Sequence, residues 1–146
     1  MKYQMLAVWL MTVGLFLASN QAFAHHSESA YDTETLVTVT GTITQFEFIN
    51  PHQLIHFEVK DPKGNVVQWI AFGSSPKALT RIGWNSHIIK PGDVLTITGI
   101  QEKSGRPIMV GLKLVRPNGE VLPGSEVEGK ILQSVLDKQH EKKPQD

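Results

Sequence analysis

The residues with the most versatile chemistry in this sequence are its six histidines, and the sequence contains no cysteine. Imidazole is the one side chain here that binds transition metals well near neutral pH. The lack of thiols excludes disulfides, thiolate zinc sites, iron–sulfur clusters and a cysteine nucleophile. Two of the histidines, His25 and His26, directly follow Ala24. The first question is therefore whether the chain places a histidine beside other nitrogen donors.

The first 24 residues have the layout of a secretory signal peptide rather than of a folded element. Lys2 is followed by an apolar run over 5–18, and the segment ends in the small-x-small sequence Ala22-Phe23-Ala24. The run of about 14 residues is shorter than the roughly 20 that span a bilayer as a helix, so we expect cleavage and no stable membrane anchor. Export would place the protein in the periplasm, with His25 as the first residue of a 122-residue mature chain.

A free amino terminus at His25 would create a metal-chelating pair on a single residue. Its α-amine and imidazole can hold one ion, and an additional imidazole would complete a nitrogen-rich, T-shaped site suited to Cu(II). His26 is adjacent and can compete or assist. At the level of the terminus alone, this arrangement resembles the histidine brace of periplasmic copper proteins and copper oxygenases. Copper or another transition metal is thus the candidate cofactor, and the alternative is an exposed terminus that binds nothing.

His52 and His56 are the second pair of candidate metal ligands. Both lie on the even-numbered face of a predicted strand, opposite Ile55, so we expect them to point outward. Four residues separate their backbones by roughly 13 Å, which is too far for both to bind one ion. Either can supply the third nitrogen to a site that begins at His25. The alternatives are a turn residue bonded to local backbone for His52 and a cross-strand surface pair for His56.

Trp84 and Arg81 are the candidate ligand-binding residues outside the histidines. Trp84 can line a ligand face, although an aromatic residue in a domain of this size is commonly part of the core. Arg81 follows a predicted helix start near Ser75 and can bind an anionic group there. The alternative for Arg81 is a solvated surface residue or a partner for a carboxylate.

The elements that must position these residues are mainly β-strands, because apolar residues alternate with polar ones between turn signals. Val, Ile, Thr and Phe are enriched in these runs. The expected strands cover 35–49, 53–60, 66–72, 94–100 and 107–115, and one short helix covers 76–82. The order β-β-β-α-β-β matches a five-stranded OB-like barrel. The alternative is an open β-sandwich or another small barrel.

The first strand is expected to be bent. Its apolar residues are odd-numbered up to Ile43 and even-numbered from Phe46, and Gly41 interrupts the run. A one-residue shift of this kind indicates a β-bulge that coils the strand.

The chain is expected to divide into four parts. A signal peptide (1–24) precedes an extended segment (25–34), the barrel domain (35–123) and a polar tail (124–146). Within the tail, apolar residues at helical spacing predict a short amphipathic helix over 128–140, which either docks or dimerises.

Three motifs in this order carry a resemblance to a known family. They are Asn50-Pro51-His52, the Ser-Pro-x-x-Leu-x-Arg-x-Gly-Trp segment over 75–84, and Lys90-Pro91-Gly92-Asp93. Behind an exported terminus they resemble an uncharacterised family of small exported proteobacterial proteins, over nearly the whole mature chain up to about residue 122. The family often has Trp at the position of Phe48 and an acidic residue near Phe72. The resemblance implies export and a small β domain of the OB type, and it supplies no activity.

Composition and motifs restrict the classes of function. The 14 basic and 14 acidic residues balance, so the chain lacks the basic excess of a general nucleic-acid binder. It contains no Gly-rich phosphate loop and no Gly-x-Ser-x-Gly motif, which disfavours a hydrolase. We therefore expect a non-enzymatic binding protein. The alternatives are a metal-free module that holds a periplasmic protein or small ligand, and a histidine-brace copper redox enzyme. The oligomeric state is left open.

Overall fold

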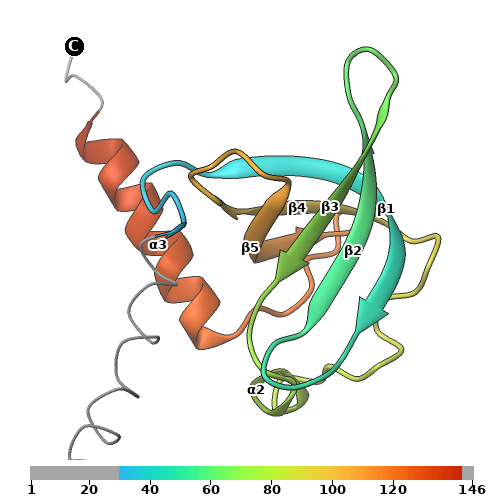
Figure 1. Ribbon diagram of the computed structural model, residues 1–146. Helices are drawn as coiled ribbons and strands as arrows, with labels where there is room; N and C mark the ends of the chain where they lie inside the picture. Colours follow the sequence, from blue (N-terminus) through green and yellow to red (C-terminus); the bar gives the residue numbers. More distant parts are fainter. Residues whose placement is uncertain (1–29, 143–146) are drawn as a thin grey trace, which may run out of the picture. The chain divides into compact units, whose positions relative to one another are not determined.

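The computed structural model describes residues 30–142, which form a five-stranded barrel, one short helix and a C-terminal helix (Figure 1). The strands are β1 (Val37–Glu47), β2 (Leu54–Lys60), β3 (Val66–Phe72), β4 (Val94–Gln101) and β5 (Ile108–Val115). The helices are α2 (Pro76–Thr80), between β3 and β4, and α3 (Glu126–Glu141), after β5.

The strands close into a barrel in the order β1-β2-β3-β5-β4. β1 is long enough to pair antiparallel with both β2 and β4. A short parallel ladder, Ile70–Phe72 of β3 against Ile108–Val110 of β5, completes the ring. This order, with a helix between the third and fourth strands, is that of the OB fold. The predicted fold class is confirmed.

The alternation of side chains along the strands fills the barrel interior. Ile43, Ile55, Phe57, Leu95, Ile97 and Met109 are all fully buried and form one apolar cluster. Their neighbours along each strand face outward, as the period of two requires. Burial of this apolar cluster fixes the register of the strands, because a slip by one residue would turn the apolar side chains to solvent.

The bend in β1 has two separate causes. The pairing register with β2 shifts between Ile43 and Gln45, which is the predicted one-residue irregularity. Gly41 lies two residues earlier, and a Cβ atom there would stand 2.6 Å from the carbonyl oxygen of Glu58. The glycine therefore allows β1 to pass close to β2. The shift in pairing register comes later along the strand, after Ile43.

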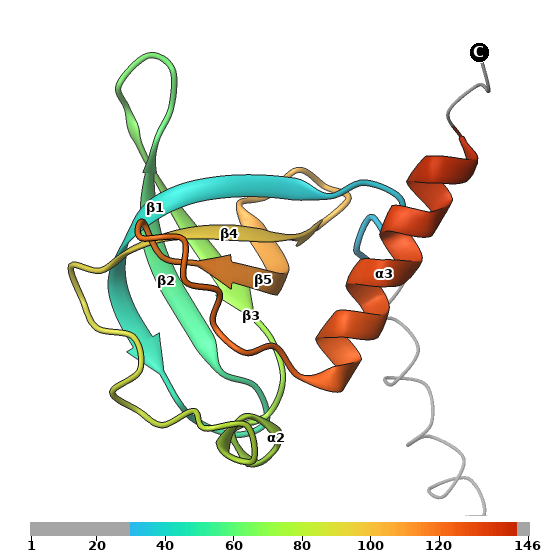
Figure 2. The same ribbon diagram turned by 180° about the vertical axis from the view of Figure 1, so that it is seen from behind.

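Helix α3 packs on the outside of the barrel. Its Val135 is buried against Ile100 of β4 and Leu112 of β5, in an apolar cluster separate from the barrel interior. Figures 1 and 2 both show α3 beside β5 and away from the β2–β3 hairpin. The helix thus begins two residues before the predicted start and docks. Neither helix between residues 30 and 142 is long and apolar enough to cross a membrane.

Candidate functional site

His52 lies in the turn between β1 and β2, and within residues 30–142 only one of its ring nitrogens makes a hydrogen bond. Its Nδ1 is 2.9 Å from the carbonyl oxygen of Gly73. A carbonyl oxygen only accepts, so in the neutral ring Nδ1 carries the hydrogen and Nε2 keeps its lone pair. Metal-binding histidines commonly donate their second ring N–H to a backbone carbonyl in this way, which fixes the tautomer and the ring orientation. His52 is therefore a turn residue bonded to backbone, but the carbonyl belongs to Gly73, 21 residues away, and not to the local backbone that was predicted. The lone pair on Nε2 is chemically able to bind a metal.

The rings of Phe72 and Tyr31 form a row with the ring of His52. The ring of Phe72, at the end of β3, lies 6.0 Å from the His52 ring and 5.5 Å from the Tyr31 ring. Burial, followed by the nearby Glu102 carboxylate, raises the pKa of Tyr31 above its usual value. The row therefore brings the beginning of the described chain close to the β1–β2 turn.

His56 lies within β2 and is paired with a carboxylate. Its Nε2 is 2.8 Å from Oε1 of Glu47 on β1, and both side chains are half-buried on the outer face. An Nε2–H that donates to the carboxylate leaves the lone pair on Nδ1. His56 thus forms the predicted cross-strand pair.

No group of three or more His, Cys, Asp or Glu side chains within residues 30–142 is arranged to hold a metal ion. The predicted ligands His25 and His26 lie outside the described residues. Of the four predicted metal ligands, the structure therefore places His52 and His56.

Trp84 is part of the core. Its ring packs 6.2 Å from that of Phe46, and its Nε1–H donates to the carbonyl oxygen of Pro123 at 2.8 Å. The indole therefore holds the chain that leads into α3 and does not present its ring on the surface. Arg81 is exposed just after α2, where its backbone N–H donates to the carbonyl oxygen of Leu79.

A buried polar cluster joins α3 to the loop after β3, and our sequence reasoning missed it. Glu128 is 6% exposed, and its two carboxylate oxygens accept the amides of Ser74 and Ser125, each at 2.8 Å. The hydroxyls of the two serines lie 2.5 Å apart. Gln53 is 2% exposed, and its Oε1 has no partner within the described chain. The spacing Ser125-x-x-Glu128 is a capping-box pattern that could have revealed the helix start.

These contacts give the serines structural roles. The sequence before Pro76 leaves Ser74 or Ser75 as the cap of α2, and the structure places it at Ser75, whose hydroxyl accepts the amide of Ala78 at 3.3 Å. Ser74 is held by Ser125 and Glu128. Both serines therefore serve the loop and the helix ends.

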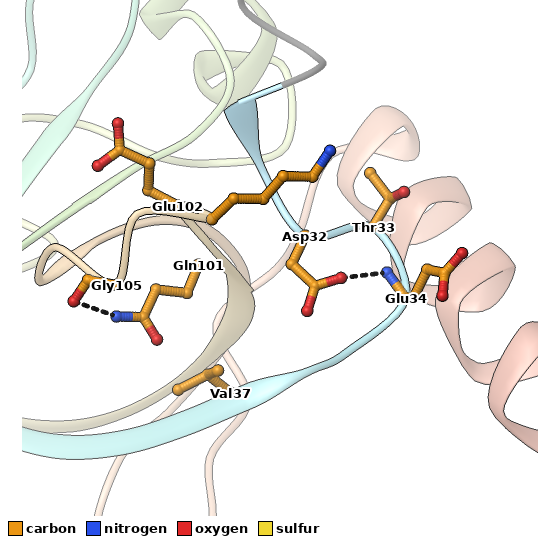
Figure 3. Close-up of a pocket in the computed structure, with 8 residues that line it drawn as sticks. Asp32, Thr33, Glu34, Val37, Gln101, Glu102 and Gly105 are labelled. Atoms are coloured by element: carbon orange, nitrogen blue, oxygen red, sulfur yellow. Dashed lines mark hydrogen bonds between the residues drawn. The ribbon is translucent and has the colours of Figure 1, made fainter.

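A solvent-open hollow of about 510 Å³ lies between the chain before β1 and the turn that follows β4 (Figure 3). It is lined by Asp32, Thr33, Glu34, Val37, Gln101, Glu102, Lys103 and Gly105.

The carboxylates of this hollow already have partners. The amide of Glu34 donates to Asp32 and lowers the pKa of Asp32, and the Arg106 guanidinium beside Glu102 lowers the pKa of Glu102. The hydrogen bond from the Lys142 ammonium group lowers the pKa of Glu34. The lowered pKa values keep all three carboxylates ionised, and Arg106 and Lys142 are the cationic partners of Glu102 and Glu34.

Comparisons with known proteins give a family and distant structural likenesses. The model of a family of unknown function, DUF6152, matches residues 14–112. No curated protein matches the chain. The mitochondrial single-stranded DNA-binding protein Rim1 of S. cerevisiae is 8% identical at a TM-score of 0.43, over 62% of this chain and 96% of that one. The yeast Stn1 and Ten1 structure is 16% identical at a TM-score of 0.37, over 73% of this chain and 53% of that one. At these identities the likeness concerns the fold alone.

Proposed function

Because the chain belongs to the DUF6152 family, a family of unknown function, we propose a function from the residues themselves. The protein is a small, non-enzymatic binding protein of the periplasm, and it holds Cu(II) or a similar transition metal through His25 and His52. The observation that carries this proposal is the His52 ring, whose Nδ1 is occupied by the Gly73 carbonyl and whose Nε2 is left with a lone pair.

The other nitrogen donors come from the mature amino terminus. Cleavage after Ala24 leaves the α-amine and the imidazole of His25 on one residue, and together they chelate one ion. His52 then supplies the third nitrogen. His26 assists as a neighbouring donor. The signal peptide that is removed by this cleavage directs the chain to the periplasm. A copper site built from nitrogen donors needs no thiolate there.

The tether between the two histidines is long enough. His25 stands six residues before Tyr31, and an extended segment of that length reaches roughly 20 Å. The rings of Tyr31 and His52 are each within 6.0 Å of the Phe72 ring. This proximity favours His52 as the third ligand, and His56, which is bonded to Glu47, is the further candidate.

A titration of the exported protein with Cu(II), followed by calorimetry and electron paramagnetic resonance, tests the proposal. We expect tight binding with a nitrogen-rich spectrum when His25 is the first residue. One extra residue before His25 removes the amine chelate, and His52→Ala removes the third nitrogen. Each change should weaken binding by at least about tenfold.

Two matched variants separate the proposed ligands from histidines in general. His87→Ala removes an exposed loop histidine and should leave the affinity unchanged. His56→Ala tests the further candidate on β2. Equal, weak binding by the native and extended termini contradicts the terminal chelate. Binding that survives the extension but is lost in His52→Ala moves the site onto the barrel.

A second candidate function is a metal-free module that holds a periplasmic protein or a small ligand. The half-exposed valines Val66 and Val67 on the β2–β3 hairpin favour it, because they offer apolar surface at the edge of the barrel. Capture of partners from a periplasmic extract, with and without a chelator, distinguishes the two functions: a metal-free module retains its partner when the chelator is present.

A further inference from the structure

The β2–β3 hairpin extends beyond the rest of the barrel, and one of its edges has no neighbouring strand. Figures 1 and 2 show its tip projecting away from the other strands and from α3 in both views. β3 pairs with β2 from Val66 to Phe72, but it pairs with β5 only from Ile70 onward. Within residues 30–142, the stretch from Val66 to Trp69 therefore has a strand on one side only.

The backbone groups along this free edge follow from the alternation of the strand. The amide of Ile70 donates to the carbonyl oxygen of Pro107 at 3.0 Å, on the side away from β2. In an antiparallel ladder every second residue turns its N–H and C=O to the same side. Val66 and Gln68 therefore also turn their backbone groups away from β2, and no residue between 30 and 142 bonds to those groups.

This edge lacks the features that usually keep strands from pairing between molecules. β3 reads VVQWIAF, with no charged residue and no proline. Charged side chains, prolines and bulges are the common means of blocking an edge. Val66 and Val67 are 51% and 36% exposed. The side-chain amide of Gln68 donates to Glu58 at 2.7 Å, so its polar end is already bonded to β2.

We propose that this edge pairs antiparallel with the same edge of a second copy of the chain, in a two-fold symmetric dimer. With the axis at Val67, residue Val66 of each copy stands opposite Gln68 of the other. Their outward backbone groups then form about four hydrogen bonds. In this register the two Val67 residues oppose each other directly, in the closer kind of antiparallel pair.

The choice of a second copy as the partner rests on self-complementarity. An uncharged edge meets its own image without opposing like charges, which a charged edge could not do. The register centred on Val67 is also the one in which both outward residues of the free edge find partners. Shifting it by two residues brings in Ile70, whose amide already bonds to Pro107. The contact is small, so the dimer forms and dissociates with concentration.

Analytical ultracentrifugation of the exported protein, from low micromolar to about 1 mM and with a chelator present, tests the dimer. The chelator removes any association through metal. We expect the wild-type protein to pass from monomer to dimer across the series. Val67→Lys or Val67→Glu alone places like charges opposite each other and should weaken dimerisation by at least about tenfold. An equal mixture of the two variants should associate again, because Lys then faces Glu.

Val127→Lys is the matched control, because it adds the same charge at an exposed valine on α3. It should dimerise like the wild type. Circular dichroism checks that each variant folds. Hydrogen exchange of the wild-type protein needs no substitution: the amides of Val66 and Gln68 should become protected as concentration rises. A wild-type protein that stays monomeric throughout the series overturns the proposal. So do Val67 variants that are folded and dimerise as tightly as the wild type.

Discussion

Gly73 is the residue at which the candidate metal ligand and the buried polar cluster meet. Its carbonyl oxygen accepts from His52, and its α-carbon faces Glu128 and Gln53. A Cβ atom at this position would stand 2.5 Å from Oε1 of Glu128 and 2.6 Å from Nε2 of Gln53. The requirement for glycine is therefore steric: any side chain would displace buried polar groups that have few other partners.

Gly73→Ala should destabilise the protein by about 2 kcal/mol or more, because the added methyl group overpacks a buried site and strains its hydrogen bonds. The free energy of unfolding in urea measures the effect. Gly129→Ala is the matched control. Nothing lies within 4 Å of a Cβ there, and the position is inside α3, so alanine should stabilise by about 0.5–1 kcal/mol. Equal effects of the two substitutions would contradict this account of Gly73.

Single residues were predicted well from the sequence where a local rule governs them, and poorly where a distant contact does. Pro76 limits the cap of α2 to Ser74 or Ser75, and the structure places the cap at Ser75. A cross-strand partner for His56 was expected, but the sequence did not indicate which residue it would be. That the partner is Glu47 depends on the register of two strands. The contact between Glu128 and Ser74 joins residues 54 positions apart, and nothing in either local pattern indicates it.

At the scale of elements, periodicity located the strands because the barrel interior selects apolar residues at every second position. The prediction for 66–72 matches β3, and those for the other strands differ from the structure by at most two residues at either end. The expected short helix over 76–82 ends earlier, at Thr80, and the amides of Ile82 and Gly83 make only turn-type hydrogen bonds. Where α3 docks was not predictable, since its apolar face suits the barrel and a second helix equally.

The start of α3 is held to the loop after β3 by one side chain, the carboxylate of Glu128. Glu128→Gln replaces a carboxylate that accepts two backbone amides with a group that has one acceptor oxygen, so one amide loses its partner. We expect a loss of about 2 kcal/mol in the free energy of unfolding, because a buried, charge-assisted hydrogen bond is removed. Glu126→Gln, two residues earlier, is the control. Its side chain is exposed and, among the described residues, pairs only with Lys130, so the change should be within about 0.5 kcal/mol. Similar losses for both variants would mean that the helix terminus responds to charge alone.

At the scale of the whole molecule, two apolar clusters share the β4–β5 ladder. One fills the barrel, and the other lies between the barrel and α3 around Ile100, Leu112 and Val135. β4 and β5 each contribute to both clusters, on opposite faces. Helix and barrel are therefore expected to unfold together, as one cooperative unit.

Ending the chain after Gly124 tests this coupling. The truncated protein keeps Pro123, which accepts from Trp84, but it exposes Ile100 and Leu112 and leaves the amide of Ser74 without Glu128. Because buried apolar surface is the main stabilising term, we expect a loss of several kcal/mol in the free energy of unfolding, measured in urea.

A pair of valine variants separates the packing of α3 from the mere presence of a C-terminal segment. Val135→Ala removes two methyl groups at a fully buried position and should cost about 2 kcal/mol, part of the loss caused by truncation. Val127→Ala, at a valine that is 62% exposed on the same helix, should change stability by less than about 0.5 kcal/mol. If the truncated chain unfolds at the same urea concentration as the full chain, α3 lies outside the cooperative unit. In that case the contact between Glu128 and the loop after β3 does not stabilise the barrel, and the orientation of His52 by Gly73 is a property of the barrel alone.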